Sequence, residues 1–583
     1  MSDKRFQAGT TRGRFLKTAG AFAFAPMPGG LFASEEKPLF RMGVMTDTHV
    51  GKTIDSCSRV KSALELFKAR RVDVVVNNGD IADHFYPSGY RALREVYNSV
   101  YANPSERPRE IWVYAWHDAY AFKKGAHRDE TAKYSQEAFA EVRRLLEASD
   151  PVTASFSFRG VPMLVFNQYD FPETFERMVS EAVAANPGKP IFVFSHVPPS
   201  GTVYNSWNWG SRFQREIYDR FPQVVDFSGH VHGSLRNDLF IWQGNFTVVN
   251  SGCLQEWGGI PVNDDSNVGK QEYGVLTVDV FPSRLLIRRF DVRDGSEIEP
   301  DSPWNVALPF SAATAAYTPD RKKARAAVPQ YPDGSRLEAK SGRDGMVTLS
   351  FPEVHGDVRS FIHRAEIERR EADCSWRRFA VRETFGDYHL KNREQERRIV
   401  FQSGYFTPGE KIRFTVHPLN AYGVAGKPLV AEYAVPPQDD WRTVVGADGL
   451  SDGFRFVRNA KGDSVTADAD GFYRPRTEAF LLMKSDAFAA KGGGRFRLVC
   501  DLDMRQDEEG SMWELSVVDA VSGRSLTRAV HTMPGAPGVL RHVFEFARPQ
   551  GAVGDLALKF RRGATSRVRF VHVRLDMSGG TAA

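Results

Sequence analysis

Five short segments in the first half of the chain place aspartate and histidine side chains directly after hydrophobic runs. They are Asp47-Thr48-His49, Gly79-Asp80, His117-Asp118, Ser195-His196 and Gly229-His230-Val231-His232. A mixture of carboxylate oxygens and imidazole nitrogens suits Zn, Fe or Mn ions, whereas Mg and Ca ions prefer oxygen ligands alone. Five of the 14 histidines of the chain lie in these segments. We therefore predict that the segments come together in one metal-binding site.

Alternating strands and helices indicate how the segments could be brought together. Residues 72–80 (VDVVVNNGD) have the continuous apolar run of a buried strand, and residues 58–71 (SRVKSALELFKARR) have apolar residues at helical spacing. This alternation predicts a mainly parallel sheet with helices outside it, and the later runs YGVLTVDV and SRLLIRRFDV predict an antiparallel pair. Ligand-binding groups belong at the carboxyl ends of parallel strands, where all five segments fall.

The motifs together resemble the calcineurin-like metallophosphoesterase family, whose pattern is D-x-H, G-D, G-N-H-[DE], a single histidine and G-H-x-H. The corresponding stretches here are DTH, GD, WHD, SH and GHVH. The resemblance covers roughly Phe40 to Val292 and implies an α/β fold, a two-sheet metallophosphoesterase sandwich flanked by helices. It also implies a metal-dependent hydrolase that cleaves a phosphomonoester or phosphodiester by attack of a metal-bound hydroxide.

The resemblance also implies a role for each motif residue. Asp80 would bridge two divalent ions. The other ligands would be Asp47, His49 and His232 at the first ion, and His196 and His230 at the second. His117, with Asp118 beside it, would be the catalytic group that protonates the leaving oxygen or stabilises charge in the transition state.

The third motif departs from the family pattern at Trp116, which stands where the family has an asparagine ligand. An indole ring has an N–H donor but no lone pair for a metal. We therefore expect one or two ions per chain, with the second ion bound more weakly. Two alternatives stay open: Asp118 or His117 could replace the missing amide, and Trp116 could contact the substrate.

Five other residues are further candidates for the site. His84 follows Asp80 by four residues and could line the site or be solvated. Asn250 ends a strand after the last motif and could orient a ligand or the substrate. The loop after His196 carries three aromatic residues, Tyr204, Trp207 and Trp209. Their rings could stack against a ring of the substrate or pack against the next domain.

The second half of the chain has an all-β character. Residues 301–328, rich in Ala, Pro, Lys and Arg, are expected to form a linker after a first domain at residues 36–300. Residues 329–437 resemble a fibronectin type III-like domain, most closely in the stretch KIRFTVHPLNAYG. Residues 438–583 alternate inward and outward side chains, which predicts a jelly-roll-like β-sandwich. The predicted fold class is therefore an α/β sandwich followed by two all-β sandwich domains.

The first 35 residues have the order of an export signal or anchor. Arg12, Arg14 and Lys17 precede the apolar stretch TAGAFAFAPMPGGLFA. The segment TRGRFLK is similar to the twin-arginine export consensus, except that Gly13 occupies the second arginine position. We expect an exported protein that is periplasmic, secreted or on the cell surface, with the twin-arginine route as one option.

Composition narrows the range of partners. A net charge of +5 over 583 residues, without a long basic run, gives no support for a nucleic-acid scaffold role. The four cysteines lie far apart and predict neither a zinc ribbon nor a disulfide framework. The expected partners are a phosphate-ester substrate and, for the β domains, a carbohydrate or cell-surface ligand. An alternative to catalysis is a degenerate phosphoesterase scaffold that binds a surface or a glycan.

Overall fold

The computed structural model describes most of the chain after the expected export segment. The described residues are 36–124, 130–255, 272–342, 346–356, 358, 360–386, 396–402, 404–436, 441–448, 454–457, 465–473, 479–483, 494–506, 513–520, 522–527, 530–532, 539–548, 555–561 and 566–578. The expected export segment, residues 1–35, lies outside them, so export stays a prediction. Among the described helices, none has the length and hydrophobicity needed to span a bilayer.

The first sheet of the N-terminal domain combines parallel and antiparallel strands. Its parallel part contains β1 (Phe40–Met45), β2 (Val74–Asn78) and β3 (Arg109–Val113). Its antiparallel part contains β10 (Gly274–Val280), β11 (Arg284–Asp291), β12 (Ser296–Ile298) and β13 (Trp304–Ala307). The predicted antiparallel pair corresponds to β10 and β11 and is confirmed.

The second sheet has the order β4-β5-β6-β7-β9-β8 in the described residues. Its strands are β4 (Ala154–Phe158), β5 (Val161–Val165), β6 (Ile191–Phe194), β7 (Val224–Ser228), β8 (Ile241–Gln243) and β9 (Thr247–Asn250). The four strands β5, β6, β7 and β9 run parallel, and the edge strands β4 and β8 run antiparallel to their neighbours. Both sheets contribute to one hydrophobic cluster, which contains Val44 and Val76 of the first sheet and Phe194 and Phe227 of the second.

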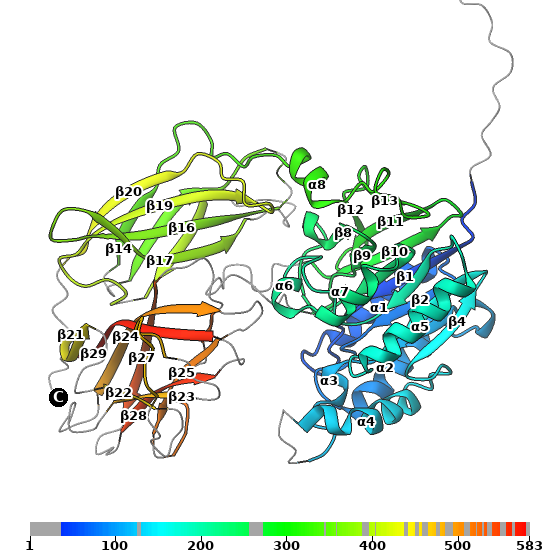
Figure 1. Ribbon diagram of the computed structural model, residues 1–583, viewed down its shortest axis with the longest axis horizontal. Coiled ribbons are helices and arrows are strands. Elements are labelled where there is room, and N and C mark those ends of the chain that lie inside the picture. The colour runs from blue at the N-terminus through cyan, green and yellow to red at the C-terminus, as the bar shows by residue number, and fades with distance from the viewer. Residues whose placement is uncertain are drawn as a thin grey trace, which may run out of the picture. The chain divides into compact units, whose positions relative to one another are not determined.

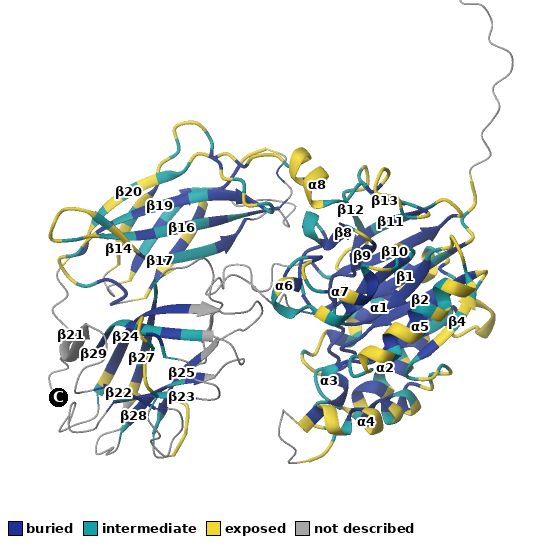
Figure 2. Cartoon of the chain, in the orientation of Figure 1, coloured by how far each residue is buried: buried dark blue, intermediate teal, exposed yellow. Residues whose placement is uncertain are grey.

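Helices cover the outer faces of this sandwich (Figure 1). The larger ones are α1 (Ser56–Ala69), α2 (Pro87–Val100), α4 (Thr131–Leu145), α5 (Pro172–Ala185) and α7 (Arg212–Tyr218). Alternate strand residues point outward to meet them: Val75 packs with α1, α2 and α4, and Val193 packs with α5 and α7. Burial on both faces explains why these strands read as continuous apolar runs (Figure 2).

The segment expected to be a linker contains regular structure. Residues 304–307 form β13, whose Trp304 and Val306 are buried in the core between the sheets, so the first domain extends past the boundary expected at residue 300. A strand of four residues at the edge of a sheet is too short to produce a clear alternating pattern. The helix α8 (Pro319–Arg325) follows, and the Thr318 side chain accepts a hydrogen bond from the Arg321 backbone N–H at its start.

Two all-β parts follow, as the sequence predicts. The first has a sheet of β14 (Glu338–Ser341), β15 (Val347–Pro352) and β18 (Glu396–Phe401), and a sheet of β16 (Phe361–Arg370), β17 (Trp376–Phe385), β19 (Lys411–Asn420) and β20 (Leu429–Ala434). The second has a sheet of β21 (Trp441–Asp448), β24 (Gly494–Gln506), β27 (Val539–Arg548) and β29 (Ser566–Ser578). Its other sheet contains β22 (Phe454–Val457), β23 (Ala479–Met483), β25 (Trp513–Asp519), β26 (Val530–Thr532) and β28 (Leu556–Arg561). The predicted fold class is confirmed.

Candidate metal centre

The five motifs lie at the carboxyl ends of strands from both sheets. Asp47 and His49 follow β1, Asp80 follows β2, His117 lies in the short helix α3 (Trp116–Ala119) after β3, His196 follows β6, and His230 and His232 follow β7. Five of these residues have positive φ angles: Asp47 (52°), His49 (39°), Asp80 (49°), His230 (71°) and His232 (32°). Non-glycine residues rarely adopt this conformation, and clusters of such residues occur at functional sites.

Glycines allow the motif loops to approach one another closely. A Cβ atom on Gly229 would lie 2.0 Å from Thr46 Oγ1 and 2.6 Å from Asp47 Oδ2. The next residue, His230, donates its backbone N–H to Asp47 Oδ2 over 2.9 Å. Gly79 has φ +96°, and a Cβ there would lie 2.7 Å from His196 Nδ1. The glycines of the G-D and G-H-x-H motifs are therefore required by close contact between loops of the two sheets.

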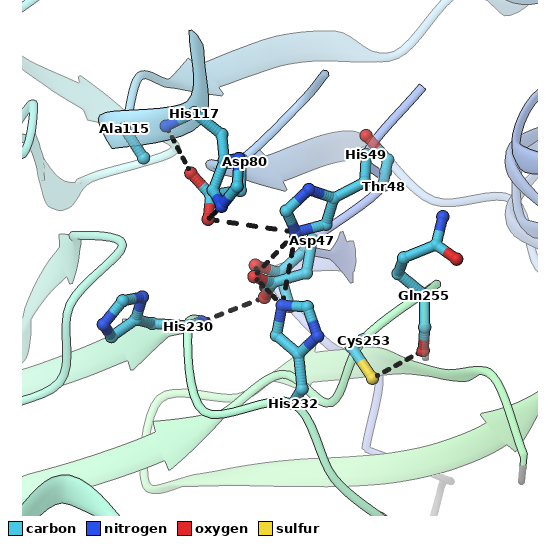
Figure 3. A network of polar contacts seen from close by, with 12 residues as sticks. Asp47, Thr48, His49, Asp80, Ala115, His117, His230, His232, Cys253 and Gln255 are labelled. Atoms are coloured by element: carbon cyan, nitrogen blue, oxygen red, sulfur yellow. Dashed lines mark hydrogen bonds and ion pairs between the residues drawn. The ribbon is translucent and has the colours of Figure 1, made fainter. Parts of the chain in front are cut away.

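The first group of potential ligands consists of Asp47, His49 and His232. Their ligand atoms all lie within 4.8 Å of one another. His232 Nε2 lies 2.8 Å from Asp47 Oδ1 and 3.3 Å from His49 Nε2. Figure 3 shows these three side chains converging around the carboxylate of Asp47. A carboxylate and two imidazoles directed at one point form a suitable set for a transition metal.

The second group consists of Asp80, His196 and His230, again with ligand atoms within 4.8 Å of one another. His196 Nε2 lies 3.0 Å from Asp80 Oδ2. It nevertheless forms no hydrogen bond among the described residues, although the ring is fully buried. A buried nitrogen that lies 3.0 Å from a carboxylate without a hydrogen bond to it fits a pair of groups that share a cation. The donors of both groups therefore fit divalent metal ions.

Asp80 lies between the two groups. Its Oδ2 atom lies 3.0 Å from His196 Nε2 and 3.9 Å from His49 Nε2, which belong to different groups. Burial alone would raise the pKa of the Asp80 carboxyl, but His196 and the other nearby imidazoles lower it far below its ordinary value. Asp80 is therefore ionised and placed as a bridging ligand would be.

Partners on the far side of the rings orient the histidine ligands. His196 Nδ1 is hydrogen-bonded to the Asn78 carbonyl oxygen over 2.9 Å, whereas His49 Nδ1 lies 3.4 Å from Asp83 Oδ1 as an ion pair without a described hydrogen bond. A partner at Nδ1 places the proton there and leaves the Nε2 lone pair for the metal. Burial lowers the pKa of His230 to about 4, which keeps that ring neutral and able to bind a metal.

Asp83 is a residue that the sequence analysis missed. Its carboxylate faces His49, and its backbone carbonyl lies 2.6 Å from His117 Nδ1, so one residue orients two rings of the site. The only sequence signal is a carboxylate three residues after Asp80 in the stretch GDIAD.

His117 and Asp118 are adjacent in sequence but face different surroundings. His117 is 30% exposed, and its Nε2 atom lies 4.0 Å from Asp80 Oδ2, so the ring borders the site. Asp118 is fully buried and accepts hydrogen bonds from the backbone N–H groups of Ile81 and Ala115 over 3.0 Å each. None of its described hydrogen bonds reaches the ring of His117. Asp118 thus holds together the loops that carry Asp80 and His117.

The two residues expected as alternatives to the missing amide ligand lie outside the second ligand group. Within the described residues, the ligand group around Asp80 contains His196 and His230 but neither His117 nor Asp118. Trp116 donates its backbone N–H to Gln168 Oε1 over 2.7 Å, and its ring lies edge-on to that of His117, with centroids 4.7 Å apart.

The remaining candidates fall into different surroundings. Asn250 donates from Nδ2 to the Gly229 carbonyl over 2.7 Å and so supports the loop that carries His230. The Trp209 ring lies 5.8 Å from that of His230, between centroids. The Tyr204 ring packs on the core, where it stacks on Phe240, and it also contacts the Trp207 ring. The described ring contact of His84 is with Tyr86.

Comparison with known proteins gives a family match and several similar solved structures. Residues 40–234 match the family model described as calcineurin-like phosphoesterase. The chain is similar to a dimetal phosphatase from Danio rerio, with 12% identity, coverage of 47% of this chain and 100% of that chain, and a TM-score of 0.31. It is also similar to a purple acid phosphatase from yellow lupin (Lupinus luteus), with 12% identity, coverage of 46% of this chain and 53% of that chain, and a TM-score of 0.32.

Another similar structure is the CBM22-1 xylan-binding domain of Paenibacillus barcinonensis Xyn10C, with 10% identity, coverage of 25% of this chain and 100% of that chain, and a TM-score of 0.17. No curated protein matches the chain. The match of residues 40–234 to the calcineurin-like phosphoesterase model confirms the predicted resemblance. Two of the three groups of potential ligands in this part of the chain contain the six residues that the resemblance implies, and the third, formed by His49, Asp83 and His117, shares His49 with the first.

Proposed function

We propose that the N-terminal domain hydrolyses phosphoric esters, either monoesters or diesters, with divalent metal ions as cofactors. The position of Asp80 carries this proposal, because its carboxylate lies between two groups of donors that come from both sheets. When bound, the ions would polarise the phosphoryl group and supply a nucleophile at neutral pH. Zn, Fe and Mn fit the donors best.

Two residues of the chain are assigned the roles that the ions would not supply, proton transfer and positioning. His117 borders the site, and its Nδ1 atom is held by the Asp83 carbonyl, so Nε2 is the atom that faces Asp80 and the substrate. We assign to its doubly protonated form the transfer of the Nε2 proton to the leaving oxygen, and because burial lowers the pKa of His117 this role is favoured at acidic pH. Asp118 acts as a positioning residue, because its hydrogen bonds tie together the loops after β2 and β3.

Metal content and hydrolysis, measured on the same preparations, test the proposal. The full chain is assayed with p-nitrophenyl phosphate and bis-p-nitrophenyl phosphate, with and without added Mn or Zn. Asp80→Asn should reduce metal binding. It should also lower kcat/KM by about 10²-fold or more, because the loss of a residue that only supports a ligand already costs about 10–100-fold. Asp219→Asn is the matched control, because Asp219 pairs with Arg215 on the surface of the same domain. Full activity in Asp80→Asn would overturn the proposal.

Trp116 favours a second candidate, a phosphoesterase scaffold that binds a surface or a glycan without catalysis. A ring in place of a ligand is one step towards a site without metal. This candidate predicts a chain that contains no metal when purified without chelator and hydrolyses neither ester. For either function we propose export to the periplasm, the cell surface or the medium, and N-terminal sequencing of the mature protein tests this.

A further inference from the structure

Two indole rings lie next to histidines of the site: one beside His117 and the other beside His230, a member of the second ligand group. The Trp116 ring lies edge-on to His117 at 4.7 Å and 90°, and the Trp209 ring lies 5.8 Å from His230. His117 and His230 both belong to the surroundings of Asp80. The two tryptophans come from different sheets, one after β3 and the other in the short helix α6 (Ser206–Trp209) after β6.

Core packing does not explain these two rings. Trp112, Trp242 and Trp304 are buried and belong to the hydrophobic clusters of the first domain. Trp116 and Trp209, by contrast, are only partly buried and belong to none of the clusters formed by the described residues. Aromatic surface that lies outside the core and next to a reaction site can contact a ligand in addition to its protein neighbours.

Both rings are held by their own segments. The Trp116 ring stacks on that of Tyr120, with centroids 4.6 Å apart and an angle of 16°, and its backbone is held by Gln168. Trp209 donates its backbone N–H to the carbonyl of Asn205, which has the left-handed φ of 58°. The next residue, Gly210, packs so closely that a Cβ would lie 2.7 Å from Ser200 Cα. A ligand would therefore find the rings in place and would not have to order them.

We propose that Trp116 and Trp209 form an aromatic subsite that selects phosphoric esters whose organic group carries a flat aromatic ring. This inference rests on the proposed function, because it concerns the substrate of the same site. The chain has exchanged a metal ligand for a ring surface at position 116, and that surface lies beside His117, where the organic group would leave. Stacking and edge contacts between rings favour a flat aromatic group over a saturated ring of similar size.

Benzyl phosphate and cyclohexylmethyl phosphate test the subsite. Both release a primary alcohol of nearly the same size, so they differ mainly in whether the ring is flat. The wild-type chain should prefer benzyl phosphate by about 3- to 10-fold in kcat/KM, which is the range expected for one aromatic contact. Trp116→Leu and Trp209→Leu should each bring the ratio closer to one. Trp207→Leu is the control, because Trp207 lies in the same loop, is 42% exposed and contacts Tyr204.

Calorimetry with benzylphosphonate and cyclohexylmethylphosphonate gives a second measurement that needs no turnover. The metal-loaded wild type should bind the benzyl compound about 3- to 10-fold more tightly, and both leucine variants should lose this difference. Binding with this preference but without hydrolysis of any ester would support the subsite and overturn the proposed function. Hydrolysis with equal rates for the two esters would support the function and overturn the subsite. Failure to bind either phosphonate would also overturn the subsite.

Discussion

Asp83 is expected to control the affinity of the first metal group without binding the metal. Its Oδ1 atom lies 3.4 Å from His49 Nδ1 without forming a described hydrogen bond, and its negative charge favours a proton on that nitrogen, which leaves Nε2 for the ion. Loss of such a partner typically reduces metal affinity 10–100-fold. The Asp83 side chain is 33% exposed, and water can partly take its place, so we expect the lower limit. The expected loss is about 10-fold, or about 1.4 kcal/mol.

Calorimetric titration of the full chain with Zn or Mn measures this effect in two variants. Asp83→Ala removes the carboxylate but keeps the backbone carbonyl that holds His117 Nδ1. Asp83→Asn keeps an oxygen that can accept a hydrogen bond, so its loss should be smaller than that of the alanine variant. Asp219→Ala is the control, because that carboxylate lies on the surface of the same domain.

The second group provides an internal reference for the same experiment. His196 is oriented by the Asn78 carbonyl and makes no described contact with Asp83, so its group should keep its affinity. An unchanged first site in Asp83→Ala would refute the argument. An equal loss at both sites would also refute it, because general disruption of the fold would then explain the result.

Three further changes give distinct outcomes. Trp116→Asn should restore a ligand and tighten metal binding at the second site several-fold, as measured by metal titration. Weaker binding at that site would contradict the idea that an amide ligand is missing there. Gly229→Ala should weaken the first site, because the added Cβ would lie 2.0 Å from Thr46 Oγ1, and normal metal affinity in that variant would show that the loop can move. In the second domain, burial would raise the pKa of Glu353, but its hydrogen bond with His363 over 2.8 Å and the charge of Arg397 lower it below its ordinary value. This ionised carboxylate stabilises the fold above about pH 4.5 and loses that effect as the pH falls through the lowered pKa. The melting temperature of Glu353→Gln should therefore fall less steeply between pH 7 and pH 3 than that of the wild type, and parallel curves would contradict this.

The parts of the fold that could be predicted are those with a strong local pattern. The run of valines in β2 is buried on both faces, so its sequence carries the signature of a central strand. The edge strand β13 escaped prediction because it has only four residues and its pairing with β11 depends on distant segments. The ligand groups were predictable because each motif sits at a strand end, and topology alone brings such ends together.

The contacts of residues that support the site without binding a metal could not be predicted from the sequence. Asp118 looks like a partner of His117 in the sequence, yet its carboxylate turns to backbone N–H groups, which only the folded loops bring within reach. Tyr204 and Trp209 lie five positions apart in one aromatic loop. The left-handed turn at Asn205 separates them, so that Tyr204 packs on the core and Trp209 reaches His230.

The two ligand groups are unequal, and this inequality follows from one substitution. The first group keeps Asp47, His49 and His232 with Asp80 beside them, and so has four potential protein ligands. The second keeps three, because the indole of Trp116 cannot replace an amide oxygen. Three protein ligands with an open position are sufficient for a catalytic metal, and an open position also admits substrate. A tryptophan at position 116 therefore both leaves the second group with three protein ligands and places a ring beside His117, so the smaller ligand set and the proposed aromatic subsite have a common structural cause.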